Sequence, residues 1–194
     1  MKAYGPVPSR RLGRSLGINN IPAKNCTYSC IYCQLGATLD LTSSRKNFFD
    51  PSELKEEVNR KVQETEGKGF QIDYLSFVPD GEPTLEKALG KEIDLVSSLG
   101  PKVAVISNAS LIWDDDVKSD LARADWVSLK VDAASEKTWR KINRPHKSLS
   151  LDKILNGIEE FSRQFTGTLA TETMLIDGYN DSREELDRLG EFLG

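Results

Sequence analysis

Helix-like and strand-like patterns alternate along most of this 194-residue sequence. Apolar residues recur at helical spacing in the segments 51–67, 85–99, 114–122, 151–165 and 182–193. Short runs rich in β-branched and aromatic residues lie before or between them, at 16–21, 72–78, 103–106, 126–131 and 169–176. Strands that alternate with helices form right-handed βαβ crossovers and a parallel sheet. The sequence therefore predicts one α/β domain with about five βα units, because a chain of this length has room for one packed core.

Polar residues follow each predicted strand at its carboxyl end. In chain order they are a cysteine segment, residues 80–82, Asn108, Asp132 and residues 177–181. The carboxyl ends of parallel strands lie at one edge of a sheet or barrel, where α/β proteins place their sites. We therefore expect these loops to converge on one functional site.

The three cysteines of the chain, Cys26, Cys30 and Cys33, all lie within one short segment. An odd, clustered set is a poor framework for disulfides, and clustered thiols in a reducing compartment more often bind a metal ion or cluster. A loop with thiolates at this spacing can hold three corners of a cuboidal iron–sulfur cluster and leave its fourth iron without a protein ligand. Such an open iron can bind a substrate or cofactor directly, as an open zinc site does in hydrolases.

A zinc site is the alternative interpretation of the same cysteines. The only histidine, His146, could complete it, although zinc sites normally take their ligands in two close pairs. The protein would then be a zinc-stabilised module without catalysis, and the basic segment before the first cysteine would bind nucleic acid. His146 could equally be a surface histidine or a proton donor.

The CxxxCxxC spacing, with Tyr32 directly before the last cysteine, resembles the signature of the radical S-adenosylmethionine (SAM) superfamily. In that family the cysteines hold one 4Fe-4S cluster, and the amino and carboxylate groups of SAM chelate its open iron. One electron from the reduced cluster cleaves SAM to methionine and a 5′-deoxyadenosyl radical, which abstracts a hydrogen atom from the substrate. The resemblance implies a radical SAM oxidoreductase or transferase, built as a partial TIM-like barrel of six βα units, with Tyr32 beside the adenine.

A second motif follows the second predicted strand. Its residues Gly81, Glu82 and Pro83 resemble the superfamily's glycine-glycine-glutamate motif, with Asp80 in place of the first glycine. The resemblance implies that this turn holds the amino group of SAM. It also implies ribose and carboxylate contacts at Asn108, Ser128 and Lys130, and adenine contacts at Ile176 and Gly178. On a buried strand, Lys130 needs either a bound anion or an acid inside the barrel as its partner.

The first 25 residues form a basic arm that contains no acidic residue and includes Lys2, Arg10, Arg11, Arg14 and Lys24. This arm could face an anion, or it could be a solvated, loop-rich terminus. Within it, the sequence at 5–17 resembles the start of a branch grouped with the wyosine-forming tRNA enzymes. Those enzymes carry a second cluster on additional cysteines, and this sequence has none to offer.

The resemblance further implies an external flavodoxin or ferredoxin as electron donor, because no cysteines remain for a second redox centre. The substrate stays open between a tRNA base and a partner protein that is activated by glycyl-radical formation, and a net charge of -4 argues against general affinity for phosphate backbones. We expect a cytoplasmic protein, since no signal peptide or membrane-spanning stretch is evident. Because about five of the six family units are found, the whole chain, 1–194, is expected to be a radical SAM core that lacks its last unit.

Overall fold

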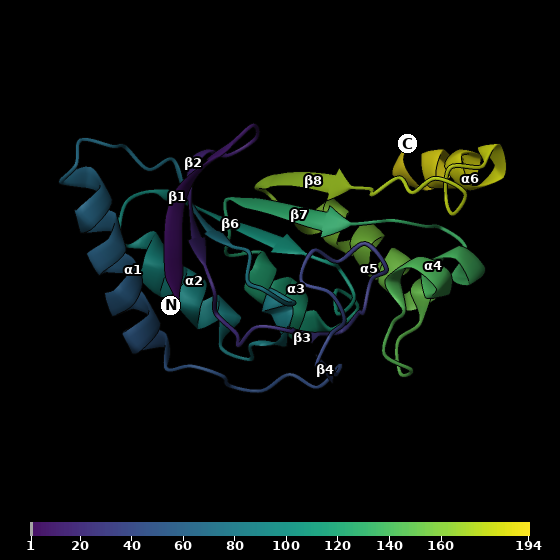
Figure 1. Cartoon of the computed structure of the whole chain (residues 1–194), viewed down its shortest axis with the longest axis horizontal. Coiled ribbons are helices and arrows are strands. Elements are labelled where there is room, and N and C mark those ends of the chain that lie inside the picture. The colour runs from purple at the N-terminus through teal and green to yellow at the C-terminus, as the bar shows by residue number, and fades with distance from the viewer. Residues whose placement is uncertain (1) are drawn as a thin grey trace.

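The computed structural model describes residues 2–194, which form a six-stranded sheet with helices packed along one face (Figure 1). In spatial order the strands are β1 (Ala3–Ser9), β2 (Gly13–Ile18), β5 (Tyr74–Phe77), β6 (Lys102–Ser107), β7 (Trp126–Lys130) and β8 (Thr168–Glu172). Strands β2, β5, β6, β7 and β8 run parallel to one another, and β1 runs antiparallel to β2. The predicted α/β class, with a parallel sheet built from βα units, is confirmed.

The described helices are α1 (Pro51–Glu66), α2 (Leu89–Ser97), α3 (Asp115–Leu121), α4 (Glu136–Asn143), α5 (Leu151–Gln164) and α6 (Arg183–Leu193). Helix α1 begins where the sequence predicts, because Asp50 accepts hydrogen bonds from the backbone N–H groups of Ser52 and Glu53 and proline occupies the first turn. The smaller elements are a 3-10 turn at Pro83–Leu85 and the short strands β3 (Asn25–Cys26) and β4 (Asp40–Leu41). Within residues 2–194, no helix is long and apolar enough to cross a membrane.

The two faces of the sheet pack against different partners, because successive strand residues point to opposite faces. On the helical face, Leu16, Leu75 and Phe77 belong to the main hydrophobic core together with residues of α1, α2, α3 and α5. On the other face, Leu12 of the β1–β2 turn packs against Ala104 and Trp126 near the amino ends of β6 and β7. The amino ends of the strands are thereby filled with apolar side chains, and the carboxyl ends remain available for a site.

The basic arm forms the β1–β2 hairpin rather than a loop-rich terminus. Lys2 pairs with Glu53 of α1 at 3.2 Å, and Arg11 pairs with Glu172 of β8 at 2.6 Å. Part of the positive charge of the arm is therefore neutralised by acids from later in the chain. Met1, which belongs to the predicted arm, lies outside the described residues.

Helix α4 is the element that the sequence pattern does not predict. Its eight residues contain only two large apolar side chains, Trp139 and Ile142, so they carry too little helical periodicity to be recognised. The helix begins after Ser135, whose hydroxyl accepts a hydrogen bond from the Thr138 N–H. The last residue of α4, Asn143, donates a hydrogen bond to Cys30 Sγ.

Three predicted elements have different bounds in the structure. The first parallel strand is Gly13–Ile18 instead of 16–21. The helix predicted from residue 85 starts at Leu89, since the Glu86 carboxylate accepts the Ala88 N–H at 2.9 Å. Strand β8 ends at Glu172 instead of 176, because the Met174 N–H donates to a side chain, Asp132 Oδ1, at 2.8 Å.

Candidate active site

The three cysteines lie in the long connection between β2 and α1, at the carboxyl edge of the parallel strands. All three thiols are free and half-buried. They line one cavity of about 180 Å³, together with Lys24, Tyr28, Leu35, Gly36, Thr38, Pro79, Asp80 and Gly81. The loop thus gathers its thiols around a single space, as the predicted cluster site requires.

Helix α4 and the loop after it hold the cysteine loop in place through backbone hydrogen bonds. Ser29 N–H donates to Asn143 O at 3.0 Å, and Ile31 N–H donates to Ile142 O at 2.9 Å. His146 N–H donates to Thr27 O at 2.9 Å. The backbone from Thr27 to Ile31 is therefore fixed by a segment more than 100 residues away in sequence.

Two side-chain amides donate to the cysteine sulfurs. Asn108 Nδ2, at the end of β6, lies 3.5 Å from Cys26 Sγ and 2.8 Å from Thr27 Oγ1. Asn143 Nδ2, at the end of α4, lies 3.4 Å from Cys30 Sγ. Hydrogen bonds from neutral donors stabilise sulfur in its anionic, ligating form.

The cysteines themselves are poor acids in this environment. Burial raises the pKa of Cys26 to about 12, with the charge of Glu82 acting in the same direction. Burial also raises the pKa of Cys30. Thiols of this kind ionise when a metal centre supplies positive charge, so the donor set suits a bound cluster better than a free thiolate nucleophile.

The predicted Gly81-Glu82-Pro83 turn packs directly against the start of the cysteine loop. Lys24 N–H donates to Asp80 O at 2.6 Å, and Glu82 N–H donates to Asn25 O at 3.1 Å. A Cβ atom on Gly81 would lie 2.1 Å from Asn25 O, so only glycine fits at this position. The turn and the cysteine loop are therefore one rigid wall of the cavity.

Glu82 is 1% exposed, and its carboxylate is occupied by internal donors. Oε1 accepts hydrogen bonds from the Thr84 N–H and hydroxyl and from the Ser107 hydroxyl, and Oε2 accepts from the Asn108 N–H at 2.7 Å. Burial raises its pKa, although these hydrogen bonds act to lower it. In the described structure Glu82 connects the ends of β5 and β6 and orients Asn108 toward Cys26. Pro83 is buried behind it at the start of the 3-10 turn.

Tyr32, Asp132, Asn143 and Lys130 form a polar group beside the second cysteine. The Tyr32 hydroxyl and Asn143 Nδ2 both donate to Asp132 Oδ2, the latter at 2.7 Å. Burial raises the pKa of Tyr32, and the charges of Cys30 and Asp132 raise it further, so the phenol is a neutral donor. Lys130 Nζ lies 5.1 Å from the Tyr32 ring centroid and forms no ion pair among residues 2–194. Of the two partners expected for Lys130, a bound anion or an acid inside the barrel, the acid is therefore not found in the described part of the chain.

The remaining predicted contacts are more dispersed. Ser128 Oγ donates to Glu172 Oε1 at 3.0 Å, so it faces the acid that pairs with Arg11. Ile176 N–H donates to Asn180 Oδ1 at 2.8 Å, while Asn180 Nδ2 donates to the Asp132 carbonyl at 2.8 Å. Gly178, with a φ of 69°, follows in the same exposed turn. The loop after β8 is thus attached to the end of β7, next to the polar group around Asp132.

Sequence reasoning missed several residues that organise the site. The sequence suggests Asn143 only as the start of a loop that could touch substrate, because α4 is not predicted, and Asn180 only as one of the polar residues 177–181, because its local pattern does not distinguish a buried amide from a turn residue. Asp132 is expected on the same strand face as Ser128 and Lys130, but its three donors come from separate elements. No group of three or more His, Cys, Asp or Glu side chains within residues 2–194 is arranged to hold a single metal ion. His146 Nδ1 instead lies 2.8 Å from Ser148 Oγ.

Comparison with known proteins gives consistent matches. The family model described as Radical SAM superfamily matches residues 20–190. A UPF0026 protein of Methanocaldococcus jannaschii is 47% identical over 191 residues, which cover 98% of this chain and 59% of that protein. A UPF0026 protein of Synechocystis is 36% identical over 183 residues, which cover 93% of this chain and 67% of that protein. The chain therefore spans about three-fifths to two-thirds of the length of these relatives.

Solved structures share the fold at low sequence identity. A structure of TYW1 with a lysine-pyruvate adduct bound has a TM-score of 0.69 and 19% identity, covering 92% of this chain and 61% of that one. Streptococcus suis SuiB bound to S-adenosylmethionine has a TM-score of 0.64 and 17% identity, covering 89% of this chain and 36% of that one. The α/β architecture predicted as a partial barrel agrees with the fold of these proteins.

Proposed function

This chain belongs to the radical SAM superfamily, and from that premise we propose that it binds one 4Fe-4S cluster through Cys26, Cys30 and Cys33 and cleaves SAM reductively. The bound cluster would supply one electron to SAM, whose carbon–sulfur bond breaks to give methionine and a 5′-deoxyadenosyl radical that takes a hydrogen atom from the substrate. The observation that carries this proposal is a set of three free thiols around one cavity. Three protein ligands leave one cluster iron open for SAM.

The side chains around the cavity support specific tasks. Asn108 and Asn143 donate to Cys26 and Cys30, so they would hold the sulfurs in their ligating form. Gly81 and its turn would offer backbone groups to the amino group of SAM beside the cysteine loop. We assign the SAM carboxylate to Lys130, whose ammonium group has no ion-pair partner in the described residues.

Further SAM contacts are assigned by resemblance. Tyr32 would lie beside the adenine, while Ser128 would contact the ribose side of the cofactor. Ile176 and Gly178 would present backbone groups to the adenine from a turn that Asn180 fixes against β7. Glu82 would position Asn108 and would also accept a hydrogen bond from the amino group of SAM. Its Oε2 accepts one hydrogen bond in the described structure, from the Asn108 N–H, and so can accept another.

The electron would come from a flavodoxin or ferredoxin, since the chain has no further cysteines for a second cluster. We place the protein in the cytoplasm, where free thiols stay reduced. The substrate is proposed to be a tRNA base or a partner protein activated by glycyl-radical formation. A binding assay with bulk tRNA across a salt series separates the two, because phosphate contacts predict a steep loss of affinity with salt.

The decisive experiment is mass spectrometry for 5′-deoxyadenosine after anaerobic reconstitution and addition of SAM and dithionite. The wild-type chain should bind iron and acid-labile sulfide and release 5′-deoxyadenosine, whereas Cys30→Ala should do neither. Leu39→Ala changes an 80% exposed residue of the same loop and should behave as wild type. A Cys30→Ala protein that still cleaves SAM would refute the assignment.

The alternative is a zinc-stabilised binding module. It is disfavoured by the hydrogen bond of His146 to Ser148 and by the lack, within residues 2–194, of a side-chain group placed around one ion. Metal analysis of protein purified without oxygen distinguishes the two, since zinc without sulfide would support the module and iron with sulfide the enzyme.

A further inference from the structure

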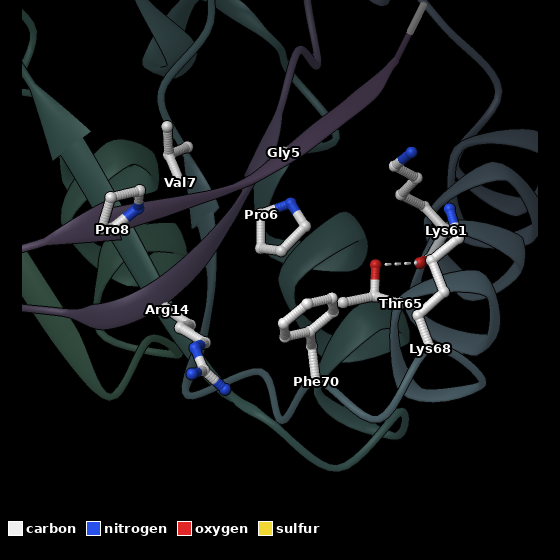
Figure 2. A pocket seen from close by; sticks show the side chains of 9 residues that line it. All are labelled: Gly5, Pro6, Val7, Pro8, Arg14, Lys61, Thr65, Lys68 and Phe70. Carbon is white, nitrogen blue, oxygen red and sulfur yellow. Dashed lines mark hydrogen bonds between the residues drawn. The ribbon is translucent and has the colours of Figure 1, made fainter.

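A second cavity, separate from the cysteine site, lies between the β1–β2 hairpin and the carboxyl-terminal end of α1. It has a volume of about 460 Å³ (Figure 2) and is lined by Gly5, Pro6, Val7, Pro8, Arg14, Lys61, Thr65, Lys68 and Phe70. Arg14 lies near the amino end of β2, and Phe70 precedes β5. The cavity is therefore at the edge of the sheet opposite to the cysteines, and nothing in the proposed SAM chemistry uses it.

Three cations surround the cavity. Figure 2 shows Lys61 and Lys68 on one side of the Phe70 ring and Arg14 on the other. Lys61 pairs with Glu64 at 3.3 Å, but Arg14 and Lys68 form no ion pair within residues 2–194. The Asp73 carboxylate, directly before β5, accepts the Arg14 backbone N–H at 2.7 Å. The lining thus retains an excess of positive charge that a bound anion would neutralise.

The walls between these cations are apolar. Phe70 is 48% exposed, and the Arg14 guanidinium carbon lies 5.4 Å from the centroid of its ring. Pro6, Val7 and Pro8 of β1 also line the cavity. An exposed aromatic ring in an apolar cavity is a surface on which a planar ring can stack.

The β1–β2 hairpin is irregular where it lines the cavity. Residues pair across β1 and β2 at Tyr4 and again at Val7, and the register shifts between these positions. Gly5 adopts a φ of 101°, and a Cβ there would lie 2.9 Å from Val7 N. The Gly-Pro-Val-Pro segment, which has no part in the cysteine site, therefore lines this cavity.

We propose that this cavity binds a nucleoside monophosphate, with the base against Phe70 on the side of Arg14 and the phosphate at Lys61 and Lys68. The volume lies in the range of small-molecule sites. The apolar walls suit a planar ring, and the cations suit a dianion. This site does not depend on the proposed cluster chemistry, so a negative result for either proposal leaves the other unaffected.

The test is titration of the anaerobically reconstituted, ¹⁵N-labelled chain with guanosine 5′-monophosphate, followed by NMR. The amide signals of Gly5, Val7 and Phe70 should shift together and saturate. Guanosine and inorganic phosphate are titrated separately, and each should bind at least about tenfold more weakly, since each lacks one half of the recognised chemistry.

Variants locate the site. A Lys61→Ala/Lys68→Ala double variant and Phe70→Ala should each weaken binding about tenfold or more, and Phe70→Trp should restore it because a ring is retained. Lys55→Ala, on another face of the same helix, should leave the affinity unchanged. Equal binding of phosphate and nucleotide, shifts confined to the cysteine loop, or insensitivity to the lysine variants would each overturn the proposal. Thermal unfolding of every variant checks that the fold is intact.

Discussion

The side-chain amide of Asn143 donates one hydrogen bond to Cys30 Sγ at 3.4 Å and another to Asp132 Oδ2 at 2.7 Å. This single amide joins a proposed cluster ligand to the polar group that also holds Tyr32 and the loop after β8. Asn143 is 1% exposed, so water has little access to compete for these two hydrogen bonds. The end of α4 therefore couples the cysteine loop to the carboxyl ends of β7 and β8.

Asn143→Ala is expected to weaken both connections. The loss of this donor to the buried Asp132 should lower the free energy of unfolding by about 1–3 kcal/mol. Loss of a hydrogen bond to a ligating sulfur should also lower the reduction potential of the reconstituted cluster. Denaturant unfolding and anaerobic potentiometry measure the two effects. Asn156→Ala, at an exposed position of α5, should change neither, and a wild-type potential in Asn143→Ala would contradict the assigned role.

Glu92 of α2 makes the stability of the fold dependent on pH. Burial raises its pKa to about 8, with the charges of Glu86 and Asp120 acting in the same direction. The folded chain then holds this proton more tightly than the unfolded chain, whose glutamate titrates near 4.5. Stability should therefore be lost as the pH rises from about 4.5 to about 8.

Glu92→Gln should remove most of this loss. Glu92 Oε1 and Asn20 Oδ1 are buried and have no hydrogen-bond partner within residues 2–194, so a neutral amide that can donate suits the site better than a carboxylate. We expect a gain on the order of 1–3 kcal/mol at pH 8 and little change at pH 5. Urea unfolding at both pH values measures it, with the exposed Glu56→Gln as control. An equal effect at the two pH values would show that titration is not the cause.

The parts of the fold that the sequence predicted are those with strong local signals. Helix α1 has an Asp50 cap, a proline in its first turn and regular apolar spacing, and it begins and ends within a residue of the prediction. The cysteines were recognised by spacing alone, which needs no knowledge of tertiary contacts. The carboxyl-edge location of the loops followed from the order of strands and helices.

The parts that escaped prediction depend on contacts between distant residues. The internal hydrogen bonds of Glu82 arise only when β5 and β6 lie side by side, so the motif could be recognised but its partners Ser107 and Asn108 could not. The hairpin of the basic arm is stabilised by Glu53 and Glu172, neither of which is near it in sequence. The local charge pattern therefore does not predict that Glu53 and Glu172 neutralise part of the charge of this arm.

Gly81→Ala tests the close contact between the second motif and the cysteine loop. The added Cβ would lie 2.1 Å from the Asn25 carbonyl, so the backbone of one of the two segments must move. We expect a loss of about 2 kcal/mol or more in stability and reduced iron per chain after reconstitution. Gly190→Ala is the matched control, because a Cβ there meets nothing within 4 Å and alanine should stabilise α6 by about 0.5–1 kcal/mol. Full iron content in Gly81→Ala would show that the loop tolerates the shift.

Lys130→Met tests the assignment of the SAM carboxylate. Methionine retains an aliphatic stem beside Tyr32 but removes the charge, and a charge-assisted contact worth about 1.5–3 kcal/mol should raise the Kd for SAM about 10- to 100-fold. Cluster content should change little, because no hydrogen bond joins Lys130 to a cysteine in the described residues and its charge has only a minor lowering effect on the pKa of Cys30. Lys153→Met is the control: its ammonium lies 5.8 Å from the Trp113 ring centroid, a similar contact on α5. Anaerobic equilibrium dialysis measures the Kd, and an unchanged value in Lys130→Met would leave the lysine with a structural role against Tyr32 and move the carboxylate to another donor.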